Sequence, residues 1–152
     1  MDGTHTALWS AFAAAALLLA TGFDAPTPVP HAPTPPATSA PGKTVDVQMI
    51  GDATGYRFSP ATVTIQRGDQ VRFTLVSGPP HNVVFWADSI PKGAAAPLAK
   101  GMPKTVDKLT GPFFLKQGDT YVVSFAGAPA GRYRYYCTPH LALGMAATIV
   151  VK

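Results

Sequence analysis

Short runs of alternating apolar and polar residues fill the chain from residue 43 to residue 152. Ala61–Gln66 alternates cleanly and stops at Arg67-Gly-Asp69, which is a turn signal. Further runs with strand character are Val45–Ile50, Gln70–Val76, His81–Trp86, Thr120–Phe125, Arg132–Cys137 and Ala146–Val151. Many short strands separated by Gly, Pro and Asp, without a long amphipathic helix, predict an all-β sandwich.

The length of 152 residues predicts one domain, at residues 43–152, preceded by an N-terminal extension. About 110 residues are enough for a single sandwich core. Within this domain, the long connection Ala87–Gly111 does not alternate. We expect it to be irregular, with a helical turn at Ala94–Ala99.

Residues 1–24 have the pattern of a secretory signal peptide or an N-terminal anchor. Their apolar stretch, Ala7–Ala20, would span ~21 Å as a helix, which is short for a ~30 Å hydrocarbon core. Small residues for cleavage follow at Ala20-Thr-Gly22, but no Lys or Arg precedes the apolar stretch. The protein is therefore expected to be exported, to the periplasm or the cell surface, with either a cleaved signal or a retained anchor.

Residues 25–42 form a linker that contains seven prolines. Such a segment cannot bury a core, so we expect it to be disordered and extended, reaching about 55 Å at ~3.1 Å per residue. It would act as a membrane tether if the anchor is retained and as a disordered tail if the signal is cleaved.

Charge is unevenly distributed along the chain. Residues 43–152 contain all twelve Lys and Arg residues but only six of the eight acidic residues, all of them Asp, so the domain carries +6. No recognition element for nucleic acid accompanies this charge, and nucleic-acid binding is therefore not expected. A docking face for an acidic redox protein, or for an anionic membrane surface, fits the charge better.

Four side chains that bind soft metals stand out against this background. Cys137, the single cysteine, is followed by His140 and Met145 on one loop between two predicted strands, and His81 lies upstream. Alone, each has an ordinary structural explanation, since a lone Cys or Met usually fills a core. Together they form the ligand set of a blue-copper site, with His81, Cys137 and His140 trigonal and Met145 long and axial.

The position of Cys137 agrees with metal binding. Alternation places it on the same face as Tyr133 and Tyr135, which is the predicted core face. A buried thiolate is costly unless a cation compensates its charge. Pro139, with its fixed φ, would help to set the loop before His140.

Other chemistries have little support. A tetrahedral zinc site that used Met would be poor, and no second Cys is available for a binuclear copper site. Cys137 and a histidine could mimic a nucleophile and base, but no oxyanion motif or glycine elbow accompanies them. We therefore assign no catalytic residue and expect the protein not to be an enzyme.

The spacing Cys137-x2-His140-x4-Met145, with the His81-Asn82 pair before a Val/Phe run, resembles the plastocyanin-like branch of the cupredoxins. The resemblance implies a Greek-key β-sandwich, the cupredoxin fold, with one copper per chain cycling between Cu(I) and Cu(II). It also implies that the backbone N–H of Asn82 points at the Cys sulfur, and that Pro80 lies near the metal.

Tyr136 matches an exposed tyrosine that precedes the copper-ligating cysteine in the plant proteins of this branch. In those proteins acidic residues surround it, whereas here its neighbours on the same face are Arg132 and Arg134. The acidic docking patch is missing, so the partners of the plant proteins are not carried over.

These features predict a monomeric carrier of single electrons between redox proteins, such as a cytochrome or an oxidase or reductase. Electrons are expected to pass through an exposed edge of His140, framed by Pro80, Pro139, Leu141 and Leu143. Two alternatives stay open from the sequence: a copper storage or delivery protein without a redox partner, and an extracellular interaction module that keeps copper only for structure.

Overall fold

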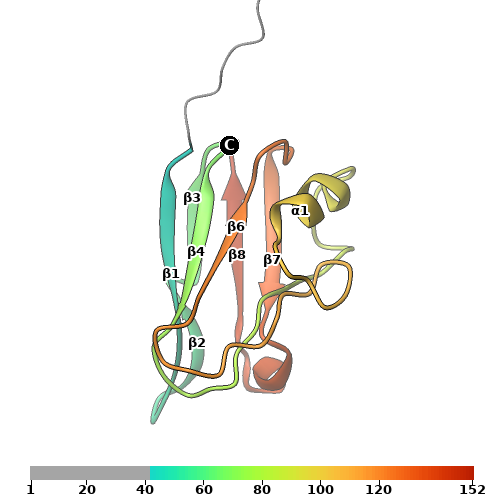
Figure 1. The fold of residues 1–152 in the computed structure, drawn as a ribbon. Helices are drawn as coiled ribbons and strands as arrows, with labels where there is room; N and C mark the ends of the chain where they lie inside the picture. The colour runs from blue at the N-terminus through green and yellow to red at the C-terminus, as the bar shows by residue number, and fades with distance from the viewer. Residues whose placement is uncertain (1–41) are drawn as a thin grey trace, which may run out of the picture. The chain divides into compact units, whose positions relative to one another are not determined.

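The alternating runs become strands whose inner residues form one core. The computed structural model describes residues 42–152, in which eight strands make two four-stranded sheets (Figure 1). One sheet has the order β2-β1-β4-β6 and the other β3-β8-β7-β5. The strands are β1 (Thr44–Asp52), β2 (Gly55–Ser59), β3 (Thr62–Ile65), β4 (Gln70–Leu75), β5 (Val84–Phe85), β6 (Thr120–Ser124), β7 (Gly131–Tyr136) and β8 (Ala146–Val151).

The chain alternates between the two sheets from β2 onward, and returns to the same sheet only for the β7–β8 hairpin. The pair β1 and β4 and the pair β3 and β8 are parallel, and the other neighbours are antiparallel. Such crossing connections cannot be made by simple hairpins. The predicted all-β Greek-key sandwich is confirmed.

Two strands differ from the sequence prediction. The run His81–Trp86 yields only the two-residue strand β5, because His81 pairs through an isolated bridge with Phe114 rather than with a neighbouring strand. Strand β2 was not predicted, because Phe58 is its single fully buried residue and so gives too little alternation to recognise.

The expected helical turn is present as α1 (Ala95–Gly101), in which Leu98 is buried. A second short helix, the 3₁₀ helix η1 (Thr138–Leu143), occupies what the sequence suggested was a plain loop after Cys137. Pro139 lies in its first turn, where a missing N–H costs nothing. Gly144, with φ of 83°, ends it in the left-handed conformation that glycine adopts without strain.

The centre of the core is aromatic and supports the strand that leads to Cys137. Tyr135 of β7 packs edge to face against Phe58 and Phe73, with ring centroids 4.7 and 5.3 Å apart. Such pairs stabilise beyond the burial of their area. Cys137, which is buried, directly follows the last residue of β7, so the packing of Tyr135 helps to determine its position.

A buried carboxylate holds the first residues of the domain. Asp69 accepts hydrogen bonds from the backbone N–H groups of Lys43 and Gln66, both at 2.8 Å.

The predictions for residues 1–24 and for the proline-rich linker up to residue 41 concern a part of the chain outside the described residues. From residue 42 onward, no helix has the length and apolar character that crossing a membrane requires.

Candidate metal centre

Three of the four predicted ligands meet at one end of the sandwich. The sulfur of Cys137 lies 3.5 Å from Nδ1 of His81 and 3.5 Å from Nδ1 of His140. The three potential ligand atoms lie within 4.8 Å of one another, and all three residues are buried. One thiol and two imidazoles that converge on a single point fit a soft, nitrogen-preferring metal such as copper.

Backbone hydrogen bonds close the loop that carries three of the predicted ligands. The N–H of Cys137 donates to the carbonyl of Met145, and the N–H of Met145 donates to the carbonyl of His140, each at 3.1 Å. The N–H of His140 in turn donates to the carbonyl of Cys137 at 3.2 Å. Met145 is fully buried directly before β8. Each of the three predicted ligands in this loop therefore takes part in a backbone hydrogen bond with another of them.

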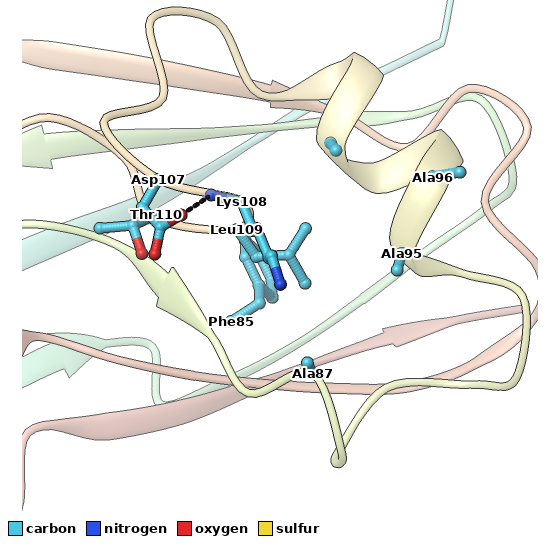
Figure 2. A pocket seen from close by; sticks show the side chains of 9 residues that line it. Phe85, Ala87, Ala95, Ala96, Asp107, Lys108, Leu109 and Thr110 are labelled. Atoms are coloured by element: carbon cyan, nitrogen blue, oxygen red, sulfur yellow. Dashed lines mark hydrogen bonds between the residues drawn. The ribbon is translucent and has the colours of Figure 1, made fainter.

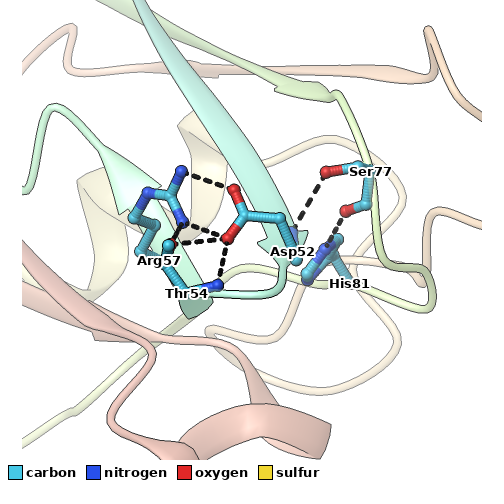
Figure 3. A network of polar contacts seen from close by, with 6 residues as sticks. Asp52, Thr54, Arg57, Ser77 and His81 are labelled. Carbon is cyan, nitrogen blue, oxygen red and sulfur yellow. Dashed lines mark hydrogen bonds and ion pairs between the residues drawn. The ribbon is translucent and has the colours of Figure 1, made fainter.

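His81 is held from a different part of the chain. Its backbone exchanges two hydrogen bonds with Phe114, at 3.1 and 2.8 Å. Its ring Nε2 lies 2.8 Å from the carbonyl oxygen of Ser77, which can only accept, so Nε2 carries the proton (Figure 3). Nδ1 is therefore the free nitrogen, and it faces the sulfur of Cys137. A second hydrogen bond of this kind fixes both the tautomer and the orientation of a metal-binding histidine.

Asn82 joins the two segments that bring the ligands together. Its side-chain Oδ1 accepts from the backbone N–H of Thr138 at 2.7 Å, and its Nδ2 donates to the Thr138 hydroxyl at 3.1 Å. Its backbone N–H also hydrogen-bonds the sulfur of Cys137. The side-chain link to Thr138 had not been expected from the sequence, which pointed only to the backbone N–H.

Burial keeps the metal-free ligands neutral. It raises the pKa of the Cys137 thiol, although the N–H groups of Asn82 and His140 act in the opposite direction. Burial also lowers the pKa of His81, against the hydrogen bond to Ser77, and lowers the pKa of His140, where the proximity of His81 adds to the effect. A bound cation reverses this balance for the thiol, because it stabilises the thiolate directly.

The sequence prediction of an exposed His140 edge is only partly correct. Pro80 and Pro139 are exposed, and Leu141 and Leu143 are 40% and 61% exposed, as an apolar frame requires. His140 itself, however, is only 7% exposed. The exposed edge of His140 is therefore smaller than the sequence suggested.

Tyr56 of β2 covers the ring of His140, and sequence reasoning missed it. The two rings are stacked, with centroids 3.6 Å apart and planes inclined by 11°. Tyr56 belongs to the one strand that the alternation did not reveal, and it is 84 positions from His140 in the chain. No local signal could have paired the two residues.

The outer face of β7 carries an aromatic and basic cluster beside the metal centre. Tyr136 packs on Trp86 with ring centroids 4.4 Å apart, and the guanidinium of Arg134 lies 4.9 Å from the centre of the Trp86 ring. Arg132 and Arg134 are exposed, as the alternation predicted. Cation–π contact of this type holds an arginine in place while leaving its charge accessible.

An apolar pocket of about 440 Å³ lies elsewhere, between α1, β5 and the segment 107–110 (Figure 2). Phe85, Ala87 and Leu109 line it, together with alanines of α1, and Asp107 and Lys108 stand at its side. None of the three converging ligands lines this pocket, so it is separate from the metal centre.

Comparison with known proteins agrees with this geometry. Residues 45–152 match the family described as copper binding proteins of the plastocyanin/azurin family. A chloroplastic plastocyanin of Tetradesmus obliquus is 36% identical over 108 residues, which cover 70% of this chain and 66% of that protein. A Synechococcus plastocyanin is 38% identical over 112 residues, covering 74% and 76% of the two chains. The chain thus spans slightly less than two thirds of the length of the chloroplastic relative.

Solved structures show the same fold. The oxidized form of plastocyanin from Dryopteris crassirhizoma is 31% identical, with a TM-score of 0.54, and the match covers 71% of this chain and all of that one. A pseudoazurin from Methylobacterium extorquens AM1 is 28% identical, with a TM-score of 0.50 and coverage of 72% and 75%. With the convergent Cys and two His in place, the chain belongs to the copper-binding proteins of the plastocyanin/azurin family.

Proposed function

We propose that the protein carries single electrons through one type 1 copper held by His81, Cys137 and His140, with Met145 as a weak axial ligand. The observation that carries this proposal is the buried sulfur of Cys137, which lies 3.5 Å from Nδ1 of each histidine. When bound, copper supplies a one-electron Cu(I)/Cu(II) couple, and a thiolate with two imidazoles is the ligand set of blue-copper electron carriers.

The residues around the ligands fit a carrier because they restrict the movement of the ligand side chains. Asn82 ties the His81 segment to Thr138, and backbone hydrogen bonds close the loop from Cys137 to Met145. Ligands held in this way keep one arrangement when the charge of the site changes, which favours rapid electron exchange. A copper storage or delivery protein must release its metal and does not need ligands held in one arrangement.

The surface above His140 suits transient contact with a redox protein. Leu141 and Leu143 are exposed there, and Phe113 and Leu115, on either side of the Phe114 that pairs with His81, are 52% and 63% exposed. Exposed apolar residues gathered at one place mark interaction surfaces in soluble proteins. We assign electron entry and exit to this apolar surface around His140.

The redox partner is proposed to be acidic and to be met outside the cytoplasm. The +6 charge of residues 43–152 and the exposed Arg132 and Arg134 beside Tyr136 support an acidic partner. The signal-like pattern of residues 1–24 supports export, with the proline-rich segment as tail or tether.

An absorption spectrum of the copper-loaded full chain tests the proposed function. We expect an intense visible band from charge transfer between the Cys137 thiolate and copper, reversible one-electron reduction, and loss of the band in Cys137→Ser. Stoichiometric copper binding by the unaltered protein without a thiolate band would contradict the type 1 assignment. Rapid copper transfer to an acceptor protein, without reversible reduction, would instead favour copper delivery.

A further inference from the structure

One hairpin contacts both histidines of the metal centre. The N–H of Gly51, near the end of β1, donates to the carbonyl oxygen of Ser77 at 2.9 Å and lies 3.3 Å from the Ser77 hydroxyl. The same carbonyl accepts the Nε2–H of His81 at 2.8 Å (Figure 3). The end of β1 therefore fixes the oxygen that orients His81.

The other strand of the hairpin contacts the second histidine. Tyr56 is the cross-strand partner of Gly51, and its ring stacks on His140 at 3.6 Å. The same ring presents its edge to His81, with centroids 6.1 Å apart and planes inclined by 65°. A single pair of opposed residues, Gly51 and Tyr56, thus supports His81 through Ser77 and His140 by direct contact.

Glycine at position 51 makes this arrangement possible. A Cβ there would lie 2.5 Å from Cε1 of Tyr56 and 3.0 Å from Cα of Gly78. Reciprocally, a Cβ on Gly78 would lie 2.5 Å from Cα of Gly51, and Gly78 has a φ of +70°. The space that a side chain would occupy is filled by the Tyr56 ring and by the Gly78 backbone, so either β-carbon would push apart the groups that hold the histidines.

Polar contacts close the turn of the hairpin. The Asp52 carboxylate accepts from both terminal nitrogens of Arg57, at 2.9 and 2.7 Å, and from the N–H and hydroxyl of Thr54, at 2.9 and 2.6 Å (Figure 3). These contacts are exposed and contribute little to stability. They link the two ends of the turn between β1 and β2, the strands that carry Gly51 and Tyr56.

We propose that the hairpin of residues 51–57 is a positioning element that holds His81 and His140 in a fixed mutual arrangement. The inference rests on the proposed function in treating both rings as copper ligands. Outer groups that orient ligand histidines typically change metal affinity about 10–100-fold when altered. The negative face of the Tyr56 ring also favours the more positive state of the His140 imidazole, which is that of the oxidised site.

Two substitutions in the full chain test the two arms of the hairpin, with Tyr56→Phe as the matched control. Tyr56→Leu removes the ring, and the His140 ring protons should lose the upfield NMR shift that a stacked aromatic produces, in the metal-free and the Cu(I) protein alike. Gly51→Ala should weaken copper binding about 10–100-fold, measured by competition with a chelator. Tyr56→Leu should raise the reduction potential, whereas Tyr56→Phe should leave the NMR shift and the potential unchanged.

The outcome is readable even if Gly51→Ala folds poorly, because Tyr56→Leu creates no clash. The inference is overturned if Tyr56→Leu abolishes the upfield shift but leaves the reduction potential as in the unaltered protein, or if a folded Gly51→Ala binds copper as tightly as the unaltered protein. It is also overturned if His140 shows no such shift in the unaltered metal-free chain. Failure of the proposed function has a different signature, which is the missing thiolate band in the unaltered protein.

Discussion

At the residue scale, one buried side-chain oxygen within residues 42–152 has no hydrogen-bond partner. The hydroxyl of Tyr135 is buried and has no hydrogen-bond partner among the described residues, and burial raises its pKa. A buried unsatisfied group costs about 1–3 kcal/mol, so Tyr135→Phe should raise the free energy of unfolding by an amount in this range. Urea denaturation of the metal-free protein measures the change.

Tyr133 provides the matched control for that substitution. It is equally buried two residues earlier on β7, but its hydroxyl donates to the carbonyl of Pro129 at 2.6 Å. Tyr133→Phe should therefore lower stability by leaving that carbonyl without its donor. A loss of stability in Tyr135→Phe similar to that in Tyr133→Phe would mean that the Tyr135 hydroxyl is satisfied by a bound water.

Sequence reasoning was strongest where the chemistry is local. Cys137, His140 and Met145 lie within nine residues, so their spacing alone pointed to one metal-binding loop. His81 could be added because its neighbours repeat a family pattern. The Tyr56 stack and the Asn82–Thr138 link could not be predicted, since each joins residues that only the folded sandwich brings together.

At the scale of elements, a strand could be predicted from the sequence when several of its residues are buried on one face in alternation. Strand β4, with Val71, Phe73 and Leu75 buried in alternation, was evident from the sequence. Strand β5 was overestimated, because His81, at the start of the run, forms an isolated bridge with Phe114 and only Val84 and Phe85 join the ladder with β7. The helix η1 was missed because its six residues follow no apolar period.

The turn before β6 is stabilised by a carboxylate, and this gives a pH prediction. Asp119 accepts hydrogen bonds from the N–H groups of Lys116 and Leu115, at 2.9 and 3.1 Å. These bonds, the one from Lys116 first, hold the pKa of Asp119 below its ordinary value of 3.8. Because the pKa is lowered in the folded state, the stabilisation is complete above pH 3.8 and is lost as the pH falls through the folded-state pKa.

Asp119→Asn should accordingly lower the melting temperature at pH 7, and the difference from the unaltered protein should shrink as the pH is lowered below 4. Asp88→Asn is the control, because the Asp88 side chain receives a hydrogen bond only from its neighbour Ser89 among the described residues. A difference that stays constant across the pH range would show that the amide, rather than the lost charge, disturbs the turn.

At the scale of the whole molecule, the net charge could be counted from the sequence, but which charged side chains form ion pairs could not be predicted. Two arginines are neutralised by bidentate pairs, Arg57 with Asp52 and Arg72 with Asp46. Neither Arg132 nor Arg134 has an ion pair within residues 42–152, and Arg134 rests on Trp86 instead. The positive charge available to a partner therefore includes the strand that leads directly to Cys137.

This distribution predicts how partner association responds to salt. The association rate with an acidic cytochrome should fall steeply as the Debye length shrinks from ~30 to ~8 Å. Arg132→Glu combined with Arg134→Glu should flatten or reverse that slope while leaving colour and potential nearly unchanged, because neither side chain contacts a ligand. The pair Lys43→Glu with Lys100→Glu makes the same change in net charge away from β7, before β1 and in α1, and should alter the slope less. Stopped-flow rates across a salt series decide between these outcomes. Equal slopes for the unaltered protein and the arginine double variant would mean that the apolar surface around His140 governs docking, and that the basic face of β7 takes no part in it.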